Sequence, residues 1–299
     1  MFLDRREFLK RVLGIILGGL ALGGCIEEEP AVSEEPTFFE GTMQKRRLGR
    51  TNFMVSAIGM GGGAIGDYRQ VGVVQEAIRM GVNFIDTAHA YSNGKSEKVI
   101  GEAIKGMREK VYIATKTGQR FARGAYREIK ESLQRLGVEK IDLLQMHGVG
   151  DLKGLKAILD PEKGALLAVR ELQKQGKIGF VGITGAHSPI DGRNFRTSER
   201  VNQENQVMTK AIKSDQFDTI QISHHIEWQE PAQELISLAK EQDIGVIIKK
   251  SLGGGKLISK YGVKHLLQFI LKNPGIHTAI PGMVRIEHVH EDVPIGYAT

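Results

Sequence analysis

The sequence predicts an α/β protein of the (β/α)8 TIM barrel class, and three observations support this prediction. Short apolar runs alternate with longer stretches of helical period, which indicates a parallel sheet covered by helices. The runs number eight, and eight strand and helix units favour a closed barrel over an open sheet. The chain has 299 residues, which is sufficient for one barrel of this type.

The predicted strands are short apolar runs that end at polar or turn-forming residues. They lie near Ala57–Met60, Asn83–Thr87, Val111–Lys116, Ile141–His147, Ile178–Thr184, Thr219–Ser223, Gly245–Lys250 and Thr278–Pro281. The helices predicted between them lie around Gln70–Met80, Glu97–Gly106, Tyr126–Leu136, Glu162–Gln175, Glu204–Lys213, Pro231–Gln242 and Val263–Lys272. Gly81, Gly137 and Gly176 follow three of these helices and are typical stop signals.

A hairpin is predicted before the first barrel strand, where Gln44–Leu48 and Asn52–Ser56 flank a short turn and would close the bottom of the barrel. An open, doubly wound sheet is the alternative architecture. In such a sheet a Gly-x-Gly-x-x-Gly motif would open a helix after a strand, and no motif of that kind occurs in this context. The glycines of Gly59–Gly63 have a different spacing.

The N-terminal part of the chain differs in composition from the rest. A basic stretch that contains Arg5-Arg6 precedes an apolar, glycine-rich run and then Cys25. The run is too short to span about 30 Å of hydrocarbon as a helix, but it fits the core of a signal peptide. Arg5-Arg6 resembles a twin-arginine export signal, and Leu22–Cys25 resembles the lipobox of a bacterial-type lipoprotein.

These features predict three regions: an export signal with lipobox over residues 1–25, an acidic disordered tether over 26–41, and the barrel over 42–299. Cleavage before Cys25 would leave the protein anchored to the outer face of the cytoplasmic membrane by its lipid, with no other membrane contact. A buried amphipathic N-terminal helix is the alternative, and an unused signal would leave the protein in the cytoplasm.

Composition excludes some classes of site and partner. The single cysteine excludes an internal disulfide and any zinc or iron–sulfur cluster built on cysteines. The net charge of +6 is modest, and basic residues do not form a block with interleaved aromatics, so no nucleic-acid partner is predicted.

Titratable residues stand at the carboxyl ends of three successive predicted strands. Asp86 and Tyr91 follow the second strand, Lys116 ends the third and His147 ends the fourth. Each residue alone has a structural explanation, such as a lysine that reaches to the surface or a hydrogen-bonded histidine at a strand end. Because the carboxyl ends of parallel strands meet at one rim, four such groups together favour a catalytic site.

Four separated segments resemble motifs of the aldo-keto reductase family. They are Gly81–Ala88 with Tyr91, Val111–Lys116, Asp142–His147 and Ile280–Gly282, and they occur in the family's order. The resemblance covers roughly Met43 to the end of the chain. It implies a (β/α)8 barrel, NADPH or less often NADH as cofactor, and a small aldehyde, ketone or quinone as substrate.

The resemblance also implies a role for each catalytic candidate. A nicotinamide would donate the hydride, and Tyr91 would donate the proton as general acid. The neighbouring Lys116 ammonium would lower the pKa of the phenol, and Asp86 would keep this ammonium charged and fixed in direction. His147, which we expect to be neutral, would donate a hydrogen bond to the carbonyl oxygen.

The implied nicotinamide-binding residues depart from the family pattern. Thr184 keeps the family's hydroxyl, but Gly185 stands where asparagine is usual. Gln221 keeps the glutamine after the sixth strand, and His224 takes the place of a stacking tyrosine. Because adjacent strand residues point to opposite faces, His224 and His225 are poor co-ligands, and no metal site is predicted.

The rest of the nucleotide is implied to lie on two later segments. The family's loop over the pyrophosphate corresponds to Ser251, Leu252 and Gly253, and the segment at the adenosine end corresponds to Gly282, Arg285, His288 and Asp292. Arg285 favours NADPH because it could neutralise a 2′-phosphate. Its register is shifted by one place, and Asp292 replaces a usual asparagine, so NADH remains open.

Two functions fit the sequence. The first is an NAD(P)H-dependent carbonyl reductase. The second is a barrel that keeps its nucleotide pocket but serves as a redox-sensing or accessory subunit with little turnover. His224 motivates the second function, as does the lack of the family's C-terminal helix and tail.

Residues Ser188–Asn202 are predicted to form an irregular insertion that covers the mouth of the barrel in place of that tail. The substrate is not identified, and an exported reductase would need a redox partner that the sequence does not name.

Overall fold

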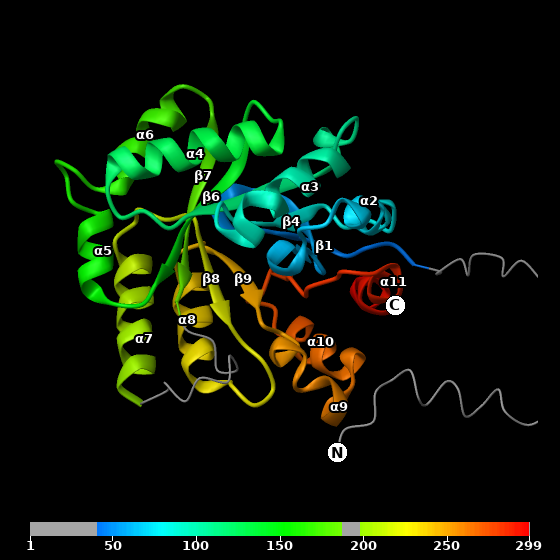
Figure 1. Ribbon diagram of the computed structural model, residues 1–299. Coiled ribbons are helices and arrows are strands. Elements are labelled where there is room, and N and C mark those ends of the chain that lie inside the picture. The colour runs from blue at the N-terminus through cyan, green and yellow to red at the C-terminus, as the bar shows by residue number, and fades with distance from the viewer. Residues whose placement is uncertain (1–40, 187–197, 299) are drawn as a thin grey trace, which may run out of the picture. The chain divides into compact units, whose positions relative to one another are not determined.

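The computed structural model describes residues 41–186 and 198–298 (Figure 1). The described residues belong to one compact unit. The predicted export signal with Arg5, Arg6 and Cys25, almost all of the predicted tether, and residues 187–197 lie outside the described residues. Within the described ranges, none of the helices combines the length and the apolar character needed to cross a bilayer.

Eight parallel strands form the barrel, each paired with its neighbours in chain order. They are β3 (Met60–Gly61), β4 (Phe84–Asp86), β5 (Tyr112–Thr117), β6 (Ile141–Val149), β7 (Ile178–Gly185), β8 (Thr219–Ser223), β9 (Gly245–Lys249) and β10 (Thr278–Ala279). The first and last strands approach each other, because Ile58 forms a parallel bridge with Ala279 and the amide of Gly61 donates to the carbonyl of Pro281 at 2.8 Å. The predicted (β/α)8 barrel is therefore confirmed, and the open-sheet alternative is wrong.

Helices cover the outside of the strands (Figure 1). Seven correspond to predicted segments: α2 (Val71–Arg79), α3 (Lys95–Ala103), α4 (Ala122–Leu136), α6 (Ala165–Lys174), α7 (Ser198–Lys213), α8 (Glu230–Glu241) and α10 (Val263–Leu271). Three shorter helices were not predicted: α5 (Leu152–Ile158), α9 (Ile258–Tyr261) and α11 (Ile286–Asp292). Because α7 already begins at Ser198, the described end of the predicted irregular insertion is helical.

The predicted hairpin is present and closes the bottom of the barrel. Strand β1 (Lys45–Arg47) pairs antiparallel with β2 (Met54–Ser56) across the 3-10 turn η1 (Gly49–Thr51). Gly49 has a φ of 49° and packs so closely on the start of β9 that a Cβ would lie 2.3 Å from the amide nitrogen of Gly245. Only glycine fits this turn. Phe53 stacks on Tyr112, the first residue of β5, with ring centroids 4.2 Å apart.

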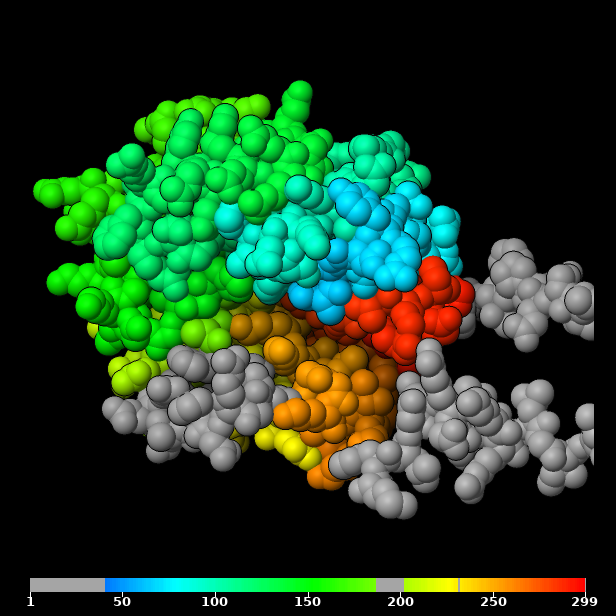
Figure 2. Space-filling view, viewed as in Figure 1, coloured from blue at the N-terminus to red at the C-terminus, as the bar shows by residue number. Residues whose placement is uncertain are grey.

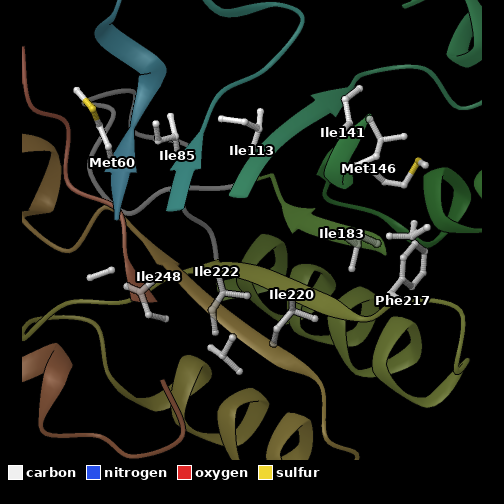
Figure 3. Close-up of a cluster of buried hydrophobic side chains, with 14 of the residues drawn as sticks. Met60, Ile85, Ile113, Ile141, Met146, Ile183, Phe217, Ile220, Ile222 and Ile248 are labelled. Carbon is white, nitrogen blue, oxygen red and sulfur yellow. The ribbon is translucent and has the colours of Figure 1, made fainter. Parts of the chain in front are cut away.

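Side chains along each strand alternate between two environments. Ile85, Ile113 and Ile220 belong to the large buried cluster between the strands and the helices (Figure 3). Phe84 and Leu143 belong to a separate cluster that includes residues of the hairpin, so they fill the lower interior of the barrel. Burying a side chain of this size contributes about 1.5–3 kcal/mol. Residues two positions further along the strands therefore point into the upper interior, where the polar side chains begin.

Candidate active site

A polar layer occupies the upper interior of the barrel, above the apolar layer. Asp86 stands two positions after Phe84 on β4, and Gln145 stands two positions after Leu143 on β6. Both are buried, as are Lys116 on β5 and Gln221 on β8. The strand period of two places all of these side chains on the inner face, where they contact one another.

Lys116 is the centre of this layer. Its ammonium donates to Oδ2 of Asp86 at 2.5 Å and to the carbonyl of Thr87 at 2.6 Å, and it lies 3.2 Å from the phenolic oxygen of Tyr91. Burial by itself lowers the pKa of Lys116, but the charge and hydrogen bonds of Asp86 and Tyr91 raise it overall. The lysine is therefore a buried cation whose direction is fixed by its carboxylate partner.

Two amides hold the other oxygen of Asp86. Gln145 Nε2 donates to Oδ1 at 2.9 Å, and Gln221 Nε2 donates to the same atom at 2.7 Å. The sequence indicated Gln221 only as a nucleotide contact and did not single out Gln145. Its spacing from His147 could have identified Gln145 as a residue of the site, because the two stand two positions apart on the same face of the strand.

The loop that carries Tyr91 is held in an unusual backbone conformation. Tyr91 begins the turn η4 (Tyr91–Gly94), in which Ser92 and Asn93 have φ values of 49° and 55°. Positive φ values are uncommon for residues other than glycine and carry a cost that the surroundings must offset. Ser92 Oγ donates to the carbonyl of Ile65 at 2.9 Å and ties this loop to the one after β3.

His147 lies edge-on to Tyr91, with ring centroids 5.6 Å apart and the planes at 82°. Burial lowers the pKa of His147 to about 3, assisted by the positive charges of Lys116, Lys249 and Arg120. The imidazole is therefore neutral near pH 7 and has one N–H to donate. The structure thus brings together all four residues that the sequence placed at this rim.

A cavity of about 600 Å³ extends from Asp86 and Tyr91 towards α11. Its wall includes five of the residues implied to bind nucleotide: Gln221, Ser251, Leu252, Gly282 and His288. Its two sides are formed partly by the segments around α9 and α11, whose surfaces lie close to each other on one face of the molecule in orange and red (Figure 2). The volume is in the range of pockets that bind cofactors.

The wall of the cavity fits a nucleotide. The hydroxyl of Ser251 is buried in the wall and has no hydrogen-bond partner among the described residues. Gly254 and Gly255 have φ values of 64° and 87°, which allow the chain to turn tightly beside the cavity. At the far end, Arg285 does not itself line the cavity, but its guanidinium lies 3.0 Å from Nε2 of His288, which does. The hydroxyl of Ser251 could donate a hydrogen bond to a phosphate group, and the guanidinium of Arg285 could pair with its negative charge.

Several residues implied to bind nucleotide lie elsewhere. His224 is buried, its Nδ1 lies 2.9 Å from the carbonyl of Trp228, and its ring packs 5.4 Å from that of Phe269 on α10. It does not line the cavity. The stacking role of His224 came from the family resemblance and stays a prediction. His224 follows the end of β8, which is Ser223.

Three other implied contacts are also set back from the cavity wall. Thr184 Oγ1 accepts a hydrogen bond from the amide of Gly148 at 2.8 Å. Gly253 is buried within the turn η6 (Gly253–Gly255). Asp292 is buried on α11, and burial together with Glu291 raises its pKa to about 7. None of the three lines the cavity.

The end of β9 contributes a charged group that the sequence did not single out. Lys249 lines the cavity beside Asp86 and Tyr91, and its ammonium donates to the carbonyl of Gly185 at 2.5 Å. Glu204 of α7 lies over the same glycine, where a Cβ would be 1.9 Å from its Oε1. Glu204 therefore fills the space that a side chain at position 185 would need. Within the described ranges, no three His, Cys, Asp or Glu side chains gather as a metal site would require.

Comparison with known proteins gives consistent matches. The model of the aldo/keto reductase family matches residues 56–265. An uncharacterized oxidoreductase of Bacillus subtilis, YqkF, is 26% identical over 301 residues, covering 84% of this chain and 90% of its own. The NADH-specific methylglyoxal reductase of Escherichia coli is 27% identical over 246 residues, covering 72% and 69%.

Solved structures share the fold. The holo form of aldo-keto reductase AKR11C1 from Bacillus halodurans superposes with a TM-score of 0.70 at 24% identity, covering 86% of this chain and 92% of that one. An aldo/keto reductase from Klebsiella pneumoniae, in complex with NADP and acetate, gives a TM-score of 0.67 at 23% identity, covering 85% and 90%.

Proposed function

Because this chain belongs to the aldo/keto reductase family, we propose that it reduces the carbonyl group of a small aldehyde, ketone or quinone to an alcohol, with Tyr91 as general acid. Family membership makes it an NAD(P)H-dependent oxidoreductase. The observation that carries the assignment of Tyr91 is the 3.2 Å contact between its phenolic oxygen and the ammonium of Lys116 beside the cavity.

The reaction needs a hydride on the carbonyl carbon and a proton on the carbonyl oxygen. A bound NAD(P)H supplies the hydride. Tyr91 donates the proton from its phenolic oxygen, and the phenolate that remains is stabilised by the Lys116 ammonium and regains a proton from solvent. Asp86 keeps this ammonium in place, and Gln145 keeps Asp86 in place through its amide.

His147 orients the substrate. Its neutral ring donates one hydrogen bond to the carbonyl oxygen, which then lies between the imidazole and the phenol. Since the pKa of His147 is lowered to about 3, the ring stays neutral throughout the range in which the enzyme would work. A protonated ring would instead repel the Lys116 ammonium.

The nucleotide would lie along the cavity. Ser251 and the glycines after it would contact the pyrophosphate, while Arg285 and His288 would contact the adenosine end. The relatives support either nucleotide, because one is named as NADH-specific and one structure contains NADP. The guanidinium of Arg285 is suited to a 2′-phosphate, so we propose NADPH as the preferred cofactor, with NADH as the alternative.

Two measurements test the function. The fluorescence of NADPH and of NADH is titrated with the purified protein, and turnover is then measured on a panel of aldehydes, ketones and quinones. Binding of at least one nucleotide and oxidation of that nucleotide by at least one carbonyl are expected. Failure to bind either nucleotide would refute the proposal. Binding without turnover of any carbonyl would favour a redox-sensing or accessory subunit.

We also propose that the protein is exported and anchored outside the cytoplasmic membrane through Cys25. The support is the sequence alone, in which the twin arginines at 5 and 6 precede an apolar run and a lipobox. Cell fractionation and mass spectrometry of the mature N-terminus test this. A lipid-modified Cys25 in the membrane fraction is expected, and a cytoplasmic product that begins at Met1 would contradict it.

A further inference from the structure

Two oppositely charged side chains lie against Gly185, the last residue of β7. Lys249, the last residue of β9, lines the cavity together with Asp86 and Tyr91. Its ammonium donates to the carbonyl of Gly185, and the carboxylate of Glu204 lies over the same residue. Lys116 is paired with Asp86, and Lys249 adds a second positive charge at this end of the cavity.

Lys249 carries a positive charge near neutral pH. Burial lowers the pKa of Lys249 to about 8, the charges of Glu204 on α7 and Asp86 on β4 oppose this shift, and those of Lys116 on β5 and Lys250 add to it. The ammonium is therefore mostly protonated at pH 7.

The same cation acts on the catalytic histidine of β6. The charge of Lys249 contributes to the lowered pKa of His147. The electric field of the Lys249 ammonium therefore extends to the position beside His147 where the carbonyl group would be reduced.

The two redox states of the nucleotide respond differently to such a field. The nicotinamide ring carries a positive charge when oxidised and none when reduced. Hydride transfer to a carbonyl beside Tyr91 requires the ring to lie at this end of the cavity. A cation in a partly buried, low-dielectric site raises the free energy of a nearby positive ring and leaves a neutral ring almost unaffected.

We propose that Lys249 makes this site bind the reduced nucleotide in preference to the oxidised one, and that Glu204 limits the size of this preference. The inference rests on the proposed function and concerns the same cavity. The consequence is reduced product inhibition: the oxidised nucleotide dissociates more readily after each turnover and competes less with the reduced nucleotide for the cavity.

The dissociation constants of NADPH and NADP⁺ test the proposal without turnover. They are measured at pH 7 by fluorescence titration and calorimetry for the full-length wild-type protein and three variants. Lys249→Met should reduce the preference for NADPH on the order of tenfold, mainly through tighter binding of NADP⁺. Glu204→Gln should increase the preference, because it removes the compensating negative charge.

Arg285→Met is the matched control. It removes a positive charge from the adenosine end of the cavity, where both redox states of the nucleotide are identical. It should weaken the binding of NADPH and NADP⁺ alike and leave their ratio unchanged. An equal change of the ratio in Lys249→Met and Arg285→Met would refute a specific role of Lys249.

A pH series on the wild-type protein provides a test that needs no substitution. The preference for NADPH should decline as the pH rises from 7 to 9.5, because the Lys249 ammonium loses its proton near pH 8. A preference that is independent of pH, or unchanged in Lys249→Met, would overturn the proposal. If neither nucleotide binds the wild-type protein, the reductase function itself is refuted together with this role.

Discussion

The ammonium nitrogen of Lys116 lies 3.2 Å from the phenolic oxygen of Tyr91, and it also lies 4.6 Å from the centroid of the tyrosine ring. The two residues reach each other because β4 and β5 pair in parallel, with Asp86 opposite Ala114. This register places the end of β5 beside the loop that follows β4. The contact therefore depends on strand pairing as well as on the two side chains.

Gln145 is expected to position Asp86 for catalysis while adding little to stability. In Gln145→Leu, Oδ1 of Asp86 loses one of its two amide donors, which costs about 1.5–3 kcal/mol. The same change removes the buried Oε1 of Gln145, which has no partner among the described residues, and so recovers about 1–3 kcal/mol. We expect kcat to fall about tenfold, with the free energy of unfolding changed by less than about 1 kcal/mol.

Steady-state kinetics and urea denaturation measure these two effects. Gln175→Leu is the control, because Gln175 is exposed and donates to Glu171 on the surface. A Gln145→Leu variant with wild-type kcat would show that Asp86 does not depend on this amide.

Arg285 is expected to distinguish NADPH from NADH. The exposed guanidinium lies next to His288 at the end of the cavity, where it could pair with a 2′-phosphate. In Arg285→Met the dissociation constant for NADPH should rise about tenfold, while that for NADH should stay within a factor of two or so. Fluorescence titration measures both constants. Lys264→Met, an exposed change on α10, serves as control. Equal losses for the two nucleotides would place the 2′-phosphate elsewhere.

Asp292 is expected to destabilise the protein at alkaline pH. Folding raises its pKa from 3.8 to about 7, so its contribution to stability is full below pH 3.8 and disappears as the pH rises through about 7. Asp292→Asn, which cannot ionise, should increase the free energy of unfolding at pH 8 by roughly 4 kcal/mol, and at pH 5 by only roughly 2 kcal/mol. Denaturant titrations at the two pH values test this, with exposed Glu287→Gln as control. A gain that is equal at both pH values would contradict it.

His277 is expected to destabilise the protein in acid. Its Nδ1 accepts a hydrogen bond from the amide of Val246 at 2.9 Å, and burial lowers its pKa from 6.5 to about 4. Stability from this group is therefore present above pH 6.5 and is lost as the pH falls towards 4. Between pH 7 and pH 5, wild-type protein should lose roughly 2 kcal/mol more than His277→Asn, whose amide oxygen can accept the same bond.

Thermal or urea unfolding at the two pH values gives this difference. His265→Asn on α10 is the control, because His265 is exposed. If the His277→Asn and wild-type proteins lost the same stability on acidification, the burial of a neutral His277 would not be responsible.

The barrel could be predicted because each strand carries its own signal. Apolar runs such as Ile141–His147 are bounded by turn formers, and the strand period places Asp86, Lys116 and His147 at one rim without any knowledge of the structure. Short helices gave weaker signals. Helix α5 has only one and a half to two turns, and its start depends on a hydrogen bond from the amide of Gly154 to the side chain of Asp151.

The charges around Gly185 could not be predicted in the same way. Glu204 and Lys249 lie on different elements, and Glu204 occupies the space that is open because Gly185 has no side chain. The direction of the His224 side chain could not be predicted either. His224 follows the last residue of β8, where the regular alternation of side chains no longer fixes a direction.

The assignment of Tyr91 as general acid is tested most directly by single-turnover and steady-state kinetics of Tyr91→Phe, with Tyr126→Phe on the surface of α4 as control. The substitution removes the phenolic oxygen next to Lys116 and leaves the ring in place. The rate of carbonyl reduction should fall by about 10³-fold, with the NADPH dissociation constant unchanged. Wild-type turnover by Tyr91→Phe would contradict the assignment.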